Sequence, residues 1–172
     1  MAIKEWSKVK PEHVEVISRH VCAIPVKLGA MARELGVSVK LSTLQPGISG
    51  HILYEDDGYI IRINRHEVRE RQRYTLAHEI AHFLLHRDEI DKPGGIEDNV
   101  LYRSGVPEQK EYEANRMAAD LVMPLGAVRK ELDAMGPLTS EEAIDQMAEV
   151  FQVSRAAMEV RLSSMGLLEV QD

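Results

Sequence analysis

The sequence predicts an α+β fold in which a small antiparallel sheet packs on a helical core. Three observations lead to this prediction: apolar residues recur at helical spacing in several segments, residues 50–64 alternate apolar and polar side chains, and an Asp-Gly pair interrupts that alternation. The chain has 172 residues, of which 44% are hydrophobic and 28% are charged. Because this suffices for one hydrophobic core, we expect a single domain over residues 1–172.

The N-terminal part is expected to form two helices and a strand. Residues 11–22 and 25–35 are predicted to be helical because a proline begins each segment and Gly36 follows the second. Residues 37–44 then form a strand. The next residues, 50–64, are expected to form a β-hairpin with a primed turn at Asp57-Gly58, and its apolar positions are Ile52, Tyr59, Ile61 and Ile63.

A long helix without glycine or proline is expected over residues 68–86. It carries the pentapeptide HEIAH at residues 78–82. Its two histidines, His78 and His82, lie one turn apart on one helix face, so both can reach one zinc ion. Glu79 would lie beside the metal, where it can take a proton from the water that zinc activates and pass it to the leaving amine. This spacing predicts a zinc-dependent peptidase.

A catalytic zinc site usually has three protein ligands, so a third must come from elsewhere. His86 shares the helix face but lies roughly 12 Å from His78 along the axis, which favours packing or support of a ligand. The better source is the apolar-periodic helix over residues 111–124, which begins with two acids and ends at a proline. On a helical wheel Glu111 lies nearer the buried stripe than Glu113, so Glu111 is the expected ligand and Glu113 the alternative.

Three other residues are candidates for supporting roles. Asn115 lies one turn after Glu111, where its amide can hold the free N–H of a ligand histidine. Residues 88–109 are polar and contain several glycines and prolines, which predicts a loop bordering the substrate cleft. Within it, Tyr102 and Arg103 can stabilise the oxyanion of a peptidase reaction; the alternative is that Tyr102 covers the core and Arg103 is solvated.

The chain after the proline at position 124 is expected to be helical over residues 125–135, 140–150 and 155–165. We therefore divide it into a catalytic core, residues 1–124, and a helical subregion, residues 125–172, whose last two helices have helix-turn-helix spacing. Its last helix offers two arginines to DNA, but the preceding helix is acidic. Structural packing is the preferred interpretation, repressor docking the second and direct DNA binding the third.

Composition narrows the class of protein further. The net charge of −7 argues against general affinity for nucleic-acid phosphates. The single cysteine, Cys22, can form no internal disulfide and excludes a cysteine-rich zinc site. No apolar stretch approaches the roughly 18 residues of a membrane span, and the first residues lack the apolar core of a signal peptide. We expect a cytoplasmic protein that does not contact membranes.

Two segments taken together, residues 73–83 (RYTLAHEIAHF) and 111–124 (EYEANRMAADLVMP), resemble the ImmA/IrrE family of zinc metallopeptidases. The likeness extends to the preceding hairpin and to residues 151–162, with Met117 where phenylalanine is more usual. The resemblance implies a gluzincin-like zinc protease inside the cell. By that similarity His78, His82 and one glutamate of the Glu111/Glu113 pair would hold zinc, with Glu79 as the general base.

The same resemblance implies a protein substrate. Members of this family cut helix-turn-helix repressors and so relieve repression of mobile elements or stress genes. Some members act by binding their partners, so the alternative is a regulatory module that sequesters a repressor or antitoxin without cutting it. Direct binding to DNA is the weaker third option.

Overall fold

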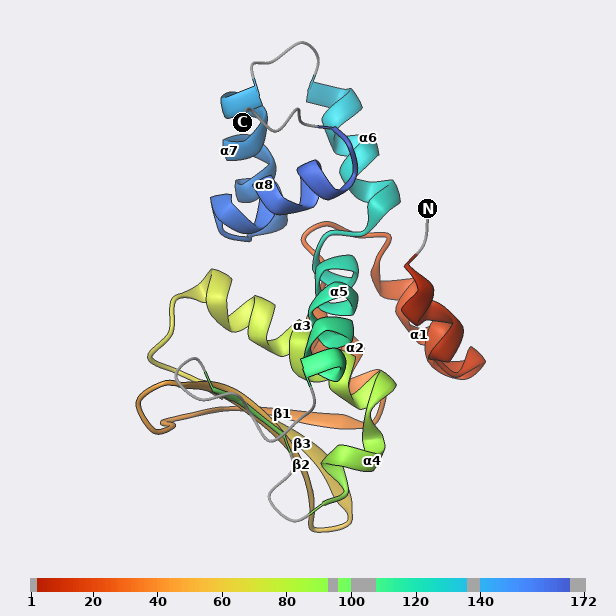
Figure 1. The fold of residues 1–172 in the computed structure, drawn as a ribbon, viewed down its shortest axis with the longest axis vertical. Coiled ribbons are helices and arrows are strands. Elements are labelled where there is room, and N and C mark those ends of the chain that lie inside the picture. The colour runs from red at the N-terminus through yellow and green to blue at the C-terminus, as the bar shows by residue number, and fades with distance from the viewer. Residues whose placement is uncertain (1–2, 93–95, 100–107, 136–139, 168–172) are drawn as a thin grey trace.

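The structure is a computed structural model that describes residues 3–92, 96–99, 108–135 and 140–167. The predicted α+β class is confirmed. A small sheet lies at one end of the molecule and three C-terminal helices at the other, with α3 (Arg69–Leu85) and α5 (Glu108–Val122) between them (Figure 1). The two middle helices pack against each other and carry the predicted metal ligands.

The sheet has four strands in the order β1-β3-β2-β4. They are β1 (Val37–Ser42), β2 (Ile48–Glu55), β3 (Gly58–Asn64) and β4 (Ile96–Asn99). β2 pairs antiparallel with both β3 and β4, whereas β1 pairs parallel with β3. The sheet is therefore mixed and not purely antiparallel as predicted, because side-chain alternation sets the faces of a strand but not its neighbour.

The β2–β3 hairpin is present as predicted, but its turn is one residue earlier. Glu55 and Gly58 form the last pair of the ladder, so the turn residues are Asp56 and Asp57. Their φ angles are 48° and 61°, as a primed turn requires. Aspartate is among the few residues that tolerate this left-handed conformation, so the turn forms without glycine at a central position.

The N-terminal helices are shorter than predicted. A 3-10 helix, η1 (Lys4–Lys8), precedes α1 (Pro11–His20) and α2 (Leu28–Glu34). The second helix begins three residues after Pro25, so that proline is not in its first turn. Gly36 has a φ of 83°, in the left-handed region that favours glycine after a helix end.

Helix α3 lies close to β2 because Gly50 has no side chain. A Cβ at this position would lie 2.5 Å from the Cγ2 of Thr75 and 3.1 Å from the backbone oxygen of Arg62. Thr75 is buried and lies one helical turn before Glu79. The close approach at Gly50 therefore sets the height of the HEIAH segment above the sheet.

The segment expected to be a loop, residues 88–109, contains more regular structure than predicted. It includes most of α4 (Arg87–Ile90), all of β4 and the start of α5. β4 has the sequence IEDN, which carries no strand pattern, and it forms by pairing with β2 and burying Ile96. Tyr102 and Arg103 lie outside the described residues.

The C-terminal helices agree with the predicted ranges. They are α6 (Leu125–Met135), α7 (Ser140–Phe151) and α8 (Arg155–Ser164), and the Ser154 side chain accepts a hydrogen bond from the backbone N–H of Ala157 at 3.2 Å, as a helix cap does. Apolar side chains of α7 and α8 join the same buried cluster as those of α3 and α5. In the described part of the chain, no helix is both long and apolar enough to cross a membrane.

Candidate metal centre

Helix α3 places the three polar residues of the HEIAH motif in the interior. His78 is 4% exposed, and Glu79 and His82 are fully buried. The helix repeat brings the Nε2 atoms of His78 and His82 to 3.0 Å from each other. Buried polar side chains are costly unless they have partners, so such a group on one helix turn indicates a site and not ordinary core packing.

Helix α5 supplies the third donor. One carboxylate oxygen of Glu111 lies 3.3 Å from His78 Nε2, and the other lies 3.5 Å from His82 Nε2. One donor atom from each of the three residues lies within 4.8 Å of the other two. Two imidazoles and a carboxylate converging in this way form a donor set suited to a metal ion.

The electrostatics of the group favour metal binding. Burial lowers the pKa of His82 to about 4, although the hydrogen bond with Glu111 opposes this shift. Burial alone would raise the pKa of Glu111, but its hydrogen bonds with His78 and His82 outweigh burial and hold that pKa well below the usual range. At neutral pH His82 is therefore neutral and Glu111 is ionised, which are the forms that bind a metal.

Glu113, the predicted alternative ligand, lies elsewhere. Its carboxylate accepts hydrogen bonds from Lys8 at 2.7 Å and Gln109 at 3.1 Å, and lies 3.2 Å from His86. The bond from Lys8, with the smaller contributions of Gln109 and His86, lowers the pKa of Glu113 to about 2 against the opposing effect of burial. It is not among the three converging donors.

The helical-wheel argument chose the residue that meets the histidines but gave the wrong order of burial. The Glu113 side chain is 8% exposed, while the Glu111 side chain is 28% exposed. A wheel gives the direction in which a side chain leaves the helix, not what its far end reaches. Contact with His86 and Lys8 buries Glu113, and Lys8 belongs to η1, which no local pattern links to α5.

Asn115 was predicted to hold the free N–H of a ligand histidine, but the structure places it at the surface. Its backbone carbonyl accepts a hydrogen bond from the hydroxyl of Tyr74 at 3.3 Å. The Nδ1 atom of His82 faces the Nδ1 atom of His86 at 3.1 Å. His78, His82 and His86 follow one another at intervals of four residues along α3 and its C-terminal end. This spacing is the sequence signal for the contact between His82 and His86.

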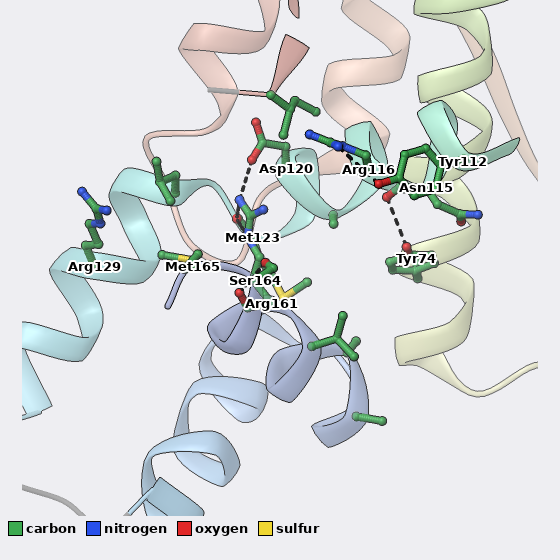
Figure 2. A pocket seen from close by; sticks show the side chains of 16 residues that line it. Tyr74, Tyr112, Asn115, Arg116, Asp120, Met123, Arg129, Arg161, Ser164 and Met165 are labelled. Atoms are coloured by element: carbon green, nitrogen blue, oxygen red, sulfur yellow. Dashed lines mark hydrogen bonds and ion pairs between the residues drawn. The ribbon is translucent and has the colours of Figure 1, made fainter. Parts of the chain in front are cut away.

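A cavity of about 940 Å³ lies between residues of α3, α5, α6 and α8 (Figure 2). Asn115, Asp120, Arg129 and Arg161 are among its lining residues, but none of the three converging donors is. The donor chemistry, and not the volume of this cavity, therefore identifies the candidate metal centre.

The two C-terminal arginines considered for DNA contact are engaged by carboxylates. Arg155 pairs with Glu141 and with Asp145, both on α7. Arg161 is buried, bonds to the Met123 carbonyl at 3.0 Å and pairs with Asp120, as Figure 2 shows. The buried guanidinium of Arg161 is therefore withdrawn from the surface, whereas Arg155 is exposed and its acidic neighbours oppose contact with phosphate.

Comparison with known proteins agrees with the predicted resemblance. Residues 32–163 match the model of the peptidase M78 family, described as the IrrE N-terminal-like domain. Over 85 residues the chain is 39% identical to the radiation response metalloprotease IrrE of Deinococcus deserti, a match covering 49% of this chain and 29% of that protein. A solved Mycobacterium tuberculosis transcriptional regulator has a similar fold, with a TM-score of 0.57, 14% identity, and coverage of 91% of this chain and 48% of that one.

This chain thus spans less than half the length of either relative. The family model, however, covers well over half of the chain and includes both helices that carry the converging donors. The chain therefore belongs to the IrrE N-terminal-like family of metallopeptidases.

Proposed function

We propose that this protein is a zinc-dependent endopeptidase. In this proposal His78, His82 and Glu111 hold the metal, and Glu79 is the general base. The observation that carries it is the buried convergence of two imidazoles and a carboxylate, with the buried carboxylate of Glu79 in the same helix turn. Two histidines and a glutamate are a donor set that catalytic zinc sites use.

Each of these side chains has a distinct part in peptide hydrolysis. The chemistry that zinc supplies when bound is Lewis acidity, which polarises the scissile carbonyl and makes a water molecule more acidic. Glu79 accepts the proton of that water as it attacks and then donates a proton to the leaving nitrogen. The surrounding core shields Glu79 from bulk water, so the proton passes between substrate and enzyme and is not lost to solvent. Tyr102 and Arg103 remain the proposed donors to the developing oxyanion.

The proposed substrate is a helix-turn-helix transcriptional repressor. The family membership supports a protein substrate, and the resemblance of residues 73–83 and 111–124 to the ImmA/IrrE family supports a repressor in particular. Cleavage would relieve repression of a mobile element or a stress response. A repressor acts on the chromosome, so the proposal also assigns the enzyme to the cytoplasm. We further propose that residues 1–172 work as one domain.

Replacing the general base tests hydrolysis separately from binding. In the Glu79→Gln variant we expect cleavage of a candidate repressor to fall by a factor of about 10² to 10⁴, because the amide cannot accept the proton. The zinc content should stay near that of the wild type, since Glu79 is not a proposed ligand. Glu70→Gln, on an exposed residue of the same helix, is the matched control and should cleave normally.

The alternative, sequestration without cleavage, gives a different pattern. Glu79→Gln would then leave relief of repression unchanged, and the zinc-loaded wild type would bind the repressor without cutting it. Either result would contradict the endopeptidase proposal while leaving the metal site in place.

A further inference from the structure

A network of hydrogen-bonding side chains leads away from the proposed metal ligand His82. The Nδ1 atom of His82 lies 3.1 Å from Nδ1 of His86, and Nε2 of His86 lies 3.2 Å from Oε2 of Glu113. The same carboxylate oxygen accepts a hydrogen bond from Lys8 at 2.7 Å. His82, His86 and Glu113 are each less than 9% exposed, so the contacts among these three are buried, whereas Lys8 lies at the surface.

The chemistry of the group fixes the direction of every hydrogen bond. The Nε2 atom of His82 faces His78 and Glu111, so to hold a metal it must carry no proton. The proton of the neutral ring is then on Nδ1, which donates to Nδ1 of His86. His86 accepts there, so its own proton is on Nε2 and is donated to Glu113.

Glu113, at the far end of this network, is held by two donors from different elements. Lys8 of η1 holds one oxygen of Glu113, and Gln109 of α5 holds the other at 3.1 Å. His86 itself is fixed to the end of α3, because its backbone N–H donates to the carbonyl of His82 at 2.7 Å. Each donor and acceptor that links His82, His86 and Glu113 thus has a partner of the right kind.

We propose that His86 and Glu113 are positioning residues that fix the tautomer and orientation of His82 for metal binding. The inference rests on the proposed role of His82 as a ligand. Partners of this kind make a ligand histidine more basic and hold its ring in place, and their loss weakens metal affinity by about 10 to 100-fold. Here the partner carboxylate acts through a second histidine, which lets η1 contribute to the metal site.

Zinc affinity of the full chain tests this inference, measured by competition with a chromophoric chelator. His86→Leu removes the acceptor for His82 and should weaken zinc binding about 10 to 100-fold. His86→Gln keeps one acceptor and one donor on a side chain of similar reach and should recover part of that loss. His13→Leu is the matched control and should bind zinc as the wild type does. His13 is a partly buried histidine that contacts Phe83 and Arg87 and is not part of the network of His82, His86 and Glu113.

The proton positions give a readout that a merely structural role would not move. In long-range ¹H–¹⁵N spectra of the zinc-loaded wild type, we expect His82 to carry its proton on Nδ1 and His86 on Nε2. A His86 proton on Nδ1 would overturn the inference. If His86→Leu does not fold, Glu113→Gln replaces it, with an expected loss of zinc affinity of about tenfold.

The possible failures are distinguishable. Unchanged zinc affinity in His86→Leu, or in Glu113→Gln where that variant replaces it, would overturn the positioning role but leave the metal site intact, provided that the wild type binds about one zinc per chain. A wild type that binds no zinc would overturn both this inference and the proposed function.

Discussion

At the scale of single residues, burial keeps the imidazole of the proposed ligand His82 neutral. His82 is fully buried, and this lowers its pKa to about 4 from the ordinary value of 6.5. Burial also lowers the pKa values of His13 and His86. The neutral form of His82 is the one that binds a metal, and keeping it neutral in the interior costs stability in acid when no metal is bound.

The metal-free protein should lose stability as the pH falls from about 6.5 to about 4. In that range the unfolded chain binds a proton at His82 and the folded chain does not, so protonation favours unfolding. The free energy of unfolding should fall by up to about 3 kcal/mol from His82 alone, since each pKa unit corresponds to about 1.4 kcal/mol. Urea denaturation with a chelator at pH 7.5, 6 and 5 measures this loss.

The control for this experiment is His82→Leu, which removes the titrating group. Its free energy of unfolding should change less over the same pH range, with a remainder from His13 and His86. Parallel pH curves for the wild type and His82→Leu would show that His82 is not the group responsible.

Helical spacing places His78 and His82 on one face of α3, so these two residues could be predicted at this scale. Glu111 could be chosen by its position on the helical wheel, but only the packing of α3 against α5 brings it to the histidines. The partners of Glu113 could not be predicted. Its contact with Lys8 joins residues 105 positions apart, and only the packing of η1 against α5 brings them together.

At the scale of elements, the position of α3 on the sheet depends on Gly50. Any side chain here would meet Thr75, one turn before the proposed general base. The sheet thus fixes the position of α3 through a close contact between Gly50 and Thr75. This contact leaves no room for an added atom, as expected of a densely packed interior.

Gly50→Ala should destabilise the protein by about 1–3 kcal/mol and weaken zinc binding, because the new methyl group pushes α3 away from β2. Combining it with Thr75→Ser removes the Cγ2 atom that it would meet and should recover part of both losses. Gly58→Ala, where a Cβ would meet nothing within 4 Å, is the control. Equal effects of Gly50→Ala and Gly58→Ala on urea denaturation would contradict this account.

Elements with a strong local pattern were the predictable ones. The hairpin of β2 and β3, the long helix α3 and helix α5 follow from periodicity and turn residues. β4 and the parallel pairing of β1 with β3 do not, because both depend on which strand edge is free after the hairpin forms.

At the scale of the whole molecule, a largely buried ion pair ties α8 to α5. Arg161 of α8 pairs with Asp120 of α5 and donates to the Met123 carbonyl, and Asp120 also accepts a hydrogen bond from Trp6 at 2.6 Å. Arg161, one of the two arginines of α8, is therefore engaged in packing against α5.

Arg161→Met should destabilise the protein by about 3 kcal/mol, because it leaves the partly buried carboxylate of Asp120 without its guanidinium partner. Arg155→Met is the matched change at an exposed arginine whose partners are also exposed, and it should cost less than about 1 kcal/mol. Urea denaturation of both variants measures the difference. A loss from Arg155→Met as large as that from Arg161→Met would show that α8 is not held mainly by Arg161.

The central claim is that one metal ion joins α3 to α5 through His78, His82 and Glu111. The most direct measurement is anomalous diffraction at the zinc edge from crystals of the zinc-loaded protein. The account predicts a single strong peak per chain within bonding distance of these three residues, with Glu113 turned toward His86. A peak on Glu113 in place of Glu111, or no peak near the two histidines, would contradict it.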